Sequence, residues 1–186
     1  MSQTKVELIA GRESPLTFPS GNGTSGQYLQ GDGAGALSWQ TITSEILQVV
    51  HSRNATQGSV INTTAWQDSG LSATITPVAA GSSILILLSQ YVYSLNSTIN
   101  ATQNYLKLRR GTTDLDEWSK GIYKTDSSSG AHGHWSNYSV YYLDTPTYTL
   151  GNAIAYNTQV RAENSTNLTL TWNSSPSTMT LVEIAA

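Results

Sequence analysis

The chain has 186 residues, of which only 11% are charged, and its formal net charge is −3. This composition lacks the positive surface that nucleic-acid binding needs, and the absence of cysteine excludes disulfide frameworks, zinc knuckles and thiol catalysis. The longest apolar run, ILILL at 84–88, is far shorter than the roughly 20 residues that span a bilayer, so we expect no membrane insertion. The first residues do not form a signal peptide either, and we expect the protein to be made and kept in a cytoplasm, or to leave it by a route other than secretion.

The first 43 residues differ from the rest in composition. Val6 and Leu8 alternate with polar residues and predict a short strand, and the proline- and glycine-rich stretch ESPLTFPSGNG follows. Residues 23–43 then read as an extended glycine-rich segment, yet they carry Leu29, Leu37 and Trp39. Such a segment does not build a hydrophobic core alone, so these apolar side chains require a partner.

From residue 44 onward the pattern is that of β-strands separated by turn-prone residues. Strands are predicted at EILQVVHS, LSATITP, SSILILLSQYVYS, NYLKLRRG, HWSNYSVYYLD, NAIAYNTQVRAE, LTLTW and TMTLVEIAA. The stretch at 82–94 has apolar residues on both faces, which is typical of a central strand buried from two sides. No amphipathic helix of three turns is found, and we therefore predict an all-β antiparallel jelly-roll sandwich.

Two groups of polar residues are candidates for a metal site or a catalytic site. His132 and His134 would share one face of a strand and could bind a metal, but no spacing selects further ligands, so we favour a polar loop and expect no metal and no cofactor. Asp114, Asp116 and Glu117 could serve a glycosidase or a calcium loop, and here we favour an exposed turn. With no nucleophile elbow or P-loop either, we expect no enzymatic activity and no catalytic residues.

The aromatic residues are the most informative side chains. Tyrosine and tryptophan outnumber phenylalanine fifteen to one (10 Tyr, 5 Trp and 1 Phe), and both suit interfaces and sugar-binding surfaces. Four of them flank the glycine- and serine-rich segment 124–134, where we predict an exposed glycan-binding surface: Trp118, Tyr123, Trp135 and Tyr138. Four more are expected in the core or in an interface between copies: Tyr91, Tyr93, Tyr141 and Tyr142.

The stretch GNGTSGQYLQGDGAGALSWQTI resembles a glycine-rich element that recurs in bacteriophage tail fibres and other virion appendages. The resemblance rests on Gly23, Gly26, Gln27, Leu29, Asp32, Gly33, Gly35, Leu37 and Trp39. Residues 45–186 are similar in texture to C-terminal domains of marine and cyanobacterial phage structural proteins, through DSGLSATITP, ILILLSQYVY, LKLRRGTT and STMTLVEIAA.

The resemblance implies a homotrimer with a knob like those of C1q and tumour necrosis factor. It implies three regions: a virion-attachment arm at 1–22, a trimer-forming connector at 23–43, and a jelly-roll domain at 44–186. The trimer interface would include Leu29, Leu37 and Trp39. Contacts of the arm with other virion proteins would involve Val6, Leu8, Ile9, Leu16 and Phe18.

The expected function follows from that likeness. We expect a virion structural protein, assembled in the host cytoplasm, that acts as a short tail fibre or spike and attaches to a host-surface polysaccharide. A capsid decoration or cement protein is the first alternative, because only one glycine-rich element precedes the knob. A spike enzyme that degrades glycans is the second.

Overall fold

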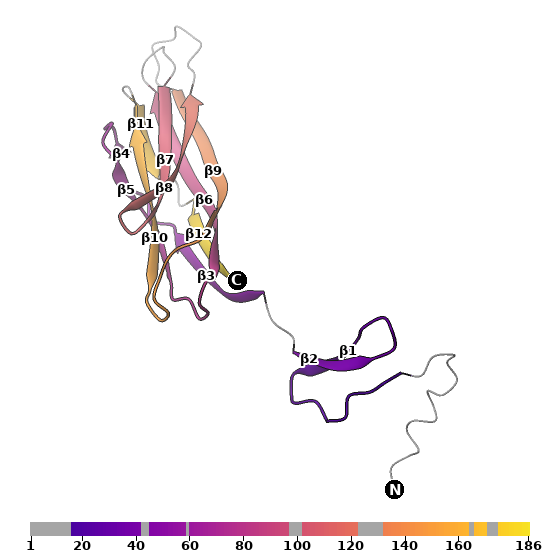
Figure 1. The fold of residues 1–186 in the computed structure, drawn as a ribbon. Coiled ribbons are helices and arrows are strands. Elements are labelled where there is room, and N and C mark those ends of the chain that lie inside the picture. Colours follow the sequence, from indigo (N-terminus) through magenta and orange to yellow (C-terminus); the bar gives the residue numbers. More distant parts are fainter. Residues whose placement is uncertain are drawn as a thin grey trace. The chain divides into compact units, whose positions relative to one another are not determined.

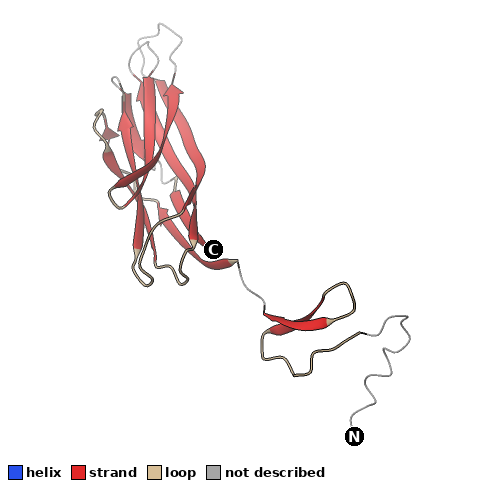
Figure 2. Cartoon of the chain, in the orientation of Figure 1, coloured by secondary structure: helices blue, strands red, loops and turns tan. Residues whose placement is uncertain are grey.

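The computed structural model describes residues 16–41, 45–58, 60–96, 102–122, 132–163, 166–170 and 175–186. The chain divides into two compact units, 1–44 and 45–186 (Figure 1). The described residues form strands and loops and no helix (Figure 2), and the strands pair in antiparallel fashion. The prediction of an all-β antiparallel chain is therefore confirmed, and the described part contains no helix able to cross a membrane.

The first unit is organised around a β-hairpin. Strands β1 (Gln27–Gly31) and β2 (Leu37–Thr41) pair with Leu29 opposite Trp39. In the connecting loop, Asp32 Oδ1 accepts hydrogen bonds from the backbone N–H groups of Ala34 and Ala36, at 2.8 and 2.9 Å. The prediction of an extended segment is thus wrong for these residues, because the aspartate and the left-handed glycines at 33 and 35 supply the turn.

The segment 16–23 belongs to the same unit as the hairpin. The N–H of Thr17 donates to the carbonyl of Gly35, and its own carbonyl accepts from Leu37. The indole N–H of Trp39 donates to the carbonyl of Gly21 at 2.8 Å, and a Cβ at position 23 would lie 2.6 Å from the indole ring. The structure therefore shows no boundary between residues 22 and 23, where the sequence predicted the end of the arm.

The second unit contains two antiparallel sheets. The first, called the β7 sheet here, has the order β5-β10-β7-β8. Its strands are β5 (Gln67–Ile75), β10 (Ile154–Ala162), β7 (Thr102–Arg110) and β8 (Thr113–Ile122).

The other sheet, called the β6 sheet, is built on both sides of β6 (Ser83–Asn96). One side of β6 pairs along its length with β9 (His132–Asp144), and the other side pairs first with β12 (Ser177–Ile184) and then with β11 (Thr166–Leu170). One edge of the sheet is formed by β3 (Ile46–Asn54), beside β12, and β4 (Val60–Ile61), beside β11, and the opposite edge is formed by β9.

The core lies between the two sheets, as in a β-sandwich. Burial alternates along the strands: on β12, Met179 and Leu181 are buried while their neighbours Thr180 and Val182 are partly exposed. One continuous cluster joins apolar residues of both sheets, such as Ile86 on β6 with Leu106 on β7. This cluster, rather than any local propensity, holds the two sheets together.

The interior also holds polar groups that are hydrogen-bonded to one another. Gln90 donates to Ser177 Oγ at 2.8 Å and accepts from the hydroxyl of Thr158 at 3.1 Å, and that hydroxyl also contacts Ser69. These contacts link β6 and β12 to β10 and β5, so they set the sandwich register as well as satisfying buried polar atoms.

Strand β8 is the main element of the second unit that the sequence did not predict. Asp114, Asp116 and Glu117, interpreted as an exposed turn, lie within this strand, so that interpretation is wrong. The strand forms because it pairs with β7 along its length, and because Leu115 and Trp118 pack against the core. Acidic residues interrupt the apolar alternation of this segment, so the sequence pattern did not reveal the inward-facing pair.

Candidate functional site

The outward face of the β6 sheet carries apolar side chains where a solvated face normally carries polar ones. The cross-strand register aligns one residue from each of four neighbouring strands in a single row: Leu143 of β9, Leu85 of β6, Val182 of β12 and Val49 of β3. Leu143 and Val49 are 54% and 58% exposed, and the two between them are partly buried. A complete apolar row therefore crosses the sheet on the side away from the core.

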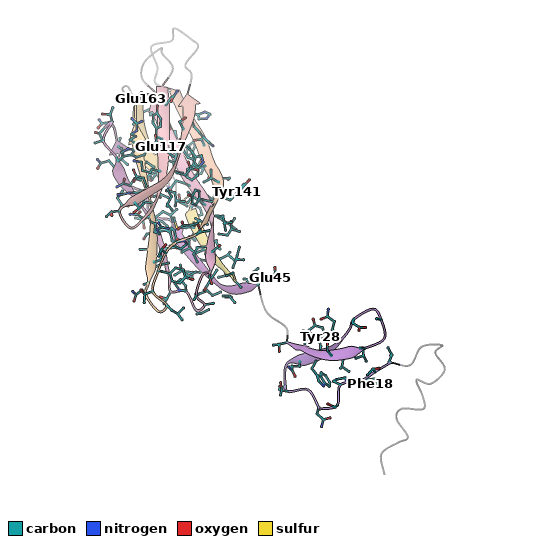
Figure 3. All side chains as sticks on the ribbon, in the orientation of Figure 1. Phe18, Tyr28, Glu45, Glu117, Tyr141 and Glu163 are labelled. Atoms are coloured by element: carbon teal, nitrogen blue, oxygen red, sulfur yellow. The ribbon has the colours of Figure 1, made fainter. Side chains whose placement is uncertain are left out.

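The adjacent row adds the most exposed aromatic residue of the second unit. It runs from Tyr141 through Leu87 and Thr180 to His51. Tyr141 is 78% exposed and points away from the sandwich (Figure 3). Leu87, Tyr141, Thr178 and Thr180 border a shallow hollow of about 370 Å³, large enough to receive a side chain from another molecule.

Further along the same two strands lies an aromatic group. Tyr93 stands opposite Trp135, with ring centroids 4.7 Å apart, and Tyr91 is 5.9 Å from the same indole. The Tyr93 ring occupies the space that a Cβ at position 133 would need, so Gly133 is required for this packing. The apolar surface of β6 and β9 therefore continues past the serine pair at positions 89 and 139.

We call the six apolar and aromatic residues of the first two rows the apolar face: Leu85, Leu87, Tyr141, Leu143, Val182 and Val49. The outward positions described on β6, β9 and β12 include no Asp, Glu, Lys or Arg. The acidic residues of these strands, Asp144 and Glu183, point inward and are buried.

Each buried carboxylate has dedicated partners. Arg110 Nη1 donates to both oxygens of Asp144 at 2.7 Å, and the hydroxyl of Tyr156 donates to Oδ2 at 2.7 Å. Burial, together with the bond to Asp144, raises the pKa of that tyrosine.

Glu183 accepts hydrogen bonds from the backbone N–H groups of Val78 and Ala79 and from the Gln48 amide. Burial by itself would raise the pKa of Glu183, but these hydrogen bonds outweigh it and hold the pKa below its ordinary value. The carboxylate is therefore kept ionised inside, and the outward side of β12 carries no charge.

The outward face of the β7 sheet has the opposite character. Lys107 and Arg109 both bind Asp114, at 2.8 and 2.9 Å, and Arg161 lies 3.7 Å from Glu117. The hydrogen bond from Lys107 lowers the pKa of Asp114. We call these residues the charged face.

The charged face also supports a tryptophan between cations. Lys107 Nζ lies 4.2 Å from the centroid of the Trp66 ring, and the Arg161 guanidinium lies 5.1 Å from it. That guanidinium also stacks 3.8 Å from the Tyr105 ring. Aromatic area on this sheet is thus covered by the chain's own charges, unlike that on the β6 sheet.

The structure does not assemble the predicted glycan surface. Tyr138 is buried, its hydroxyl donates to the carbonyl of Asn104 at 2.7 Å, and its assignment to an exposed site is wrong. Trp118 packs against the core from β8, whereas Trp135 is exposed on the outward side of β9. Alternation along the strands separates them, and Tyr123 lies outside the described residues.

The hairpin keeps its apolar residues at the surface. None of the described residues of the first unit, 16–41, is buried. Leu29, Leu37 and Trp39 fall on one side of the hairpin, because they occupy the positions paired with one another or two residues apart. Of the predicted attachment residues, Phe18 is 45% exposed and Leu16 is partly buried, while Val6, Leu8 and Ile9 lie outside the described residues.

The polar groups considered as metal or catalytic sites remain dispersed. No cluster of three or more potential metal-ligating side chains occurs among the described residues. His134 is exposed, and the side chain of His132 lies outside the described part. Asp114 is engaged with two cations on the charged face.

The residues of the apolar face were only partly identified from sequence. Tyr141 was expected in the core or in an interface, and the two-sided apolar pattern of 82–94 was interpreted as burial on both sides. The structure supplies cover for one side alone. The apolar residues on both sides of 82–94 were the sequence signal that could have identified Leu85 and Leu87 as apolar surface residues.

Comparison with known proteins adds no relative: no protein-family model matches the chain, and no curated protein shows significant similarity to it.

Proposed function

We propose that the protein is a homotrimeric virion structural protein of a bacteriophage, a short tail fibre or spike that attaches the particle to a host-surface glycan. The observation that supports assembly is the apolar face. An uncharged row of apolar residues across four strands is typical of a surface that another protein covers. The phage assignment and the number three come from the sequence resemblance.

The partner that suits this face is another copy of the same chain. An uncharged surface gains from contact with one that is equally uncharged, because every ion left facing it would lose solvation without compensation. The charged face cannot offer such a surface, whereas a symmetric oligomer brings apolar faces from several copies to one axis. Tyr141 of one copy would fill the hollow between Leu87 and Thr180 of the next.

The hairpin gives a second, independent reason for assembly. None of its described residues is buried, and a unit of this size has too little core to be stable alone. Three copies would bury Leu29 and Leu37 against each other. Trp39 already contacts Gly21 and Gly23 of its own chain, so its role in the trimer would be to fix the hairpin against segment 16–23.

The jelly-roll part of the proposal is supported by strand order. If β3 with β4 count as the first strand and β11 with β12 as the eighth, the β6 sheet reads first, eighth, third and sixth. The β7 sheet reads second, seventh, fourth and fifth. Eight strands in two such sheets form the pair of Greek keys of a jelly roll, a fold found in viral capsid and lectin domains.

Immunogold labelling of virions, with antibodies raised against residues 45–186, tests the proposal. We expect label at the tail. Label over the head would replace the fibre with the decoration protein, and unlabelled virions would refute a virion role. Light scattering of the purified chain should give three times the monomer mass, and a monomer would refute the trimer.

A further inference from the structure

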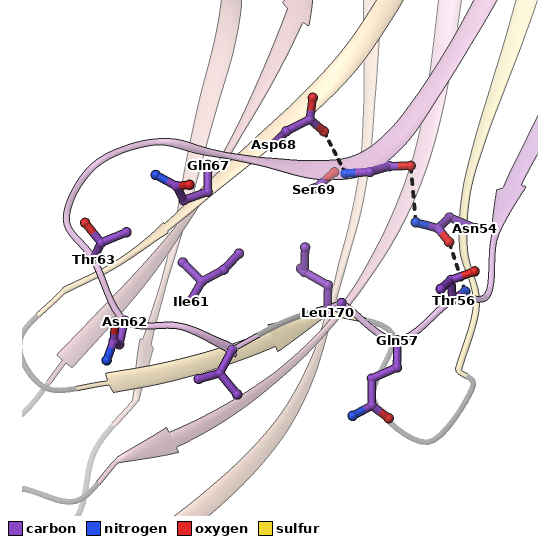
Figure 4. Close-up of a pocket in the computed structure, with 13 residues that line it drawn as sticks. Asn54, Thr56, Gln57, Ile61, Asn62, Thr63, Gln67, Asp68, Ser69 and Leu170 are labelled. Atoms are coloured by element: carbon purple, nitrogen blue, oxygen red, sulfur yellow. Dashed lines mark hydrogen bonds between the residues drawn. The ribbon is translucent and has the colours of Figure 1, made fainter.

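A hollow at one end of the β6 and β7 sheets is independent of both the apolar face and the predicted aromatic site. It has a volume of about 420 Å³ and lies between residues 54–63 and the start of β5 (Figure 4). Ile61 and Leu170 lie between its two walls, and amide and hydroxyl side chains surround them: Asn54, Thr56, Gln57, Asn62, Thr63, Gln67 and Ser69.

The walls are held in place by hydrogen bonds of the chain itself. Asn54 donates to the carbonyl of Gly70 at 3.2 Å and accepts from the N–H of Thr56 at 2.9 Å, and Asp68 Oδ1 accepts from the N–H of Gly70 at 2.7 Å. Gly70 has a φ of 73°, and a Cβ there would lie 3.0 Å from the Asn54 amide nitrogen. Asn54 and Asp68 therefore fasten the two sides of the hollow through one left-handed glycine.

Other polar groups of the lining are left available. The side chains of Gln57, Asn62 and Gln67 make no hydrogen bond to another described residue. Three amides thus face solvent around an apolar centre, whereas the Asp68 carboxylate points away from Ile61 and Leu170 (Figure 4). An amide offers both donors and an acceptor.

The charges of the lining select the ligand class. Among the described residues that line the hollow, Asp68 is the one charged group, and none is Lys, Arg or His. A carboxylate or phosphate ligand would meet an acidic residue and no cation. A neutral polyhydroxylated ligand can instead exchange hydrogen bonds with the amides and place its C–H groups on Ile61 and Leu170.

We propose that this hollow binds a neutral saccharide. The proposal deepens the glycan attachment proposed above and moves it away from the aromatic residues. Gln57, Asn62 and Gln67 bond the hydroxyls of the sugar, and the hydrogen-bonded wall at Gly70 keeps the site in place before binding.

Saturation-transfer difference NMR on the full chain tests the site with glucose, galactose, mannose and N-acetylglucosamine, and with glucuronate as the acidic probe. We expect saturable binding of at least one neutral sugar with a Kd on the order of 1–10 mM. We expect no saturable binding of glucuronate. Equal binding of glucuronate, or no saturable binding of any neutral sugar, overturns the proposal.

Variants then locate the binding. Asn62→Ala removes one of the unbonded amides and should weaken binding by about three- to tenfold. Gln67→Ala should weaken it by about three- to tenfold. Asn152→Ala removes an exposed amide from a different hollow and should bind as the parent does. Loss of affinity in this control, or parental affinity in both test variants, places the sugar elsewhere and refutes the site.

Two further measurements separate this proposal from the proposed function. The unfolding midpoint of each variant should match the parent, so that a weaker signal reports binding rather than folding. If the protein is a trimer on virion tails but binds no neutral sugar, the saccharide site is refuted and the virion role is not. A monomer absent from virions that still binds sugar retires the virion role alone.

Discussion

The two outward faces of the sandwich differ in whether charged side chains of the same chain cover their apolar and aromatic residues. On the charged face, Trp66 and Tyr105 lie under Lys107 and Arg161, so the face is complete within one chain. On the apolar face, Tyr141 and its neighbours have no such cover. The same alternation of strands produces both faces, and the difference supports the proposed assembly through the β6 sheet.

Buried charges make this difference possible. The acidic residues on β9 and β12, Asp144 and Glu183, point inward to dedicated partners. If either pointed outward, the apolar face would carry a charge at its centre or rim. The acidic residues of β9 and β12 therefore lie inside the sandwich, whereas those of β8 that bind Lys107, Arg109 and Arg161 lie outside it.

The largest expected effect comes from placing a charge on the apolar face. Leu87→Glu should abolish the oligomer, because an unpaired carboxylate in an apolar interface costs several kcal/mol per copy. Ser119→Glu adds the same charge to the β7 sheet and should leave the mass unchanged. Light scattering compares the two, and a Leu87→Glu protein that stays fully assembled would show that this face is not the interface.

The next effect contrasts two neighbouring residues of β6. Ile86→Ala removes a fully buried side chain and should lower the free energy of unfolding by about 2–5 kcal/mol, whatever the oligomeric state. Leu87→Ala should cost stability only where the chains are assembled. Denaturant unfolding at high and low protein concentration separates the two, since only the outward variant should lose a concentration-dependent part.

A smaller effect concerns the inward carboxylate of β12. Glu183→Gln should lower the free energy of unfolding by about 1–3 kcal/mol near neutral pH, because backbone N–H groups lose a charged acceptor. The folded pKa of Glu183 is lowered, so its contribution is complete above the ordinary glutamate pKa of about 4.3 and is lost as the pH falls through the folded value.

The pH dependence can be read from urea unfolding at several values between neutral and acidic pH. The parent should lose stability on acidification more steeply than the Glu183→Gln variant does. Parallel curves would mean that Glu183 is not held ionised by its partners.

The smallest effect should come from the charged face. Asp114→Asn removes an exposed carboxylate that two cations share, and solvent screens such pairs. Assembly by light scattering and the unfolding midpoint should both stay close to the parent. A loss of assembly would break the comparison, because it would give the β7 sheet a share in the interface.

Much of the fold follows from the sequence because apolar and polar residues alternate along most of its strands. The segments that contain β5, β6, β7, β10 and β12 were predicted from apolar residues at every second position and from the turns between them. Strand β8 was not predicted because acidic residues separate its inward residues, Leu115 and Trp118. The cations that pair with the acidic face of β8 come from other strands, such as Lys107 of β7. The hairpin was not predicted because its turn depends on Asp32 and two left-handed glycines rather than on apolar periodicity.

The sequence by itself determined that the chain is all-β, that β6 is apolar on both sides, and that aromatic residues exceed what one core needs. Only the tertiary structure decided which side of each strand faces the core, because that depends on the register between strands far apart in the chain. It buried Tyr138 and exposed Tyr141, three residues further along the same strand. It also formed the hollow beside Gly70, because the groups that meet there come from four strands whose pairing no local pattern encodes.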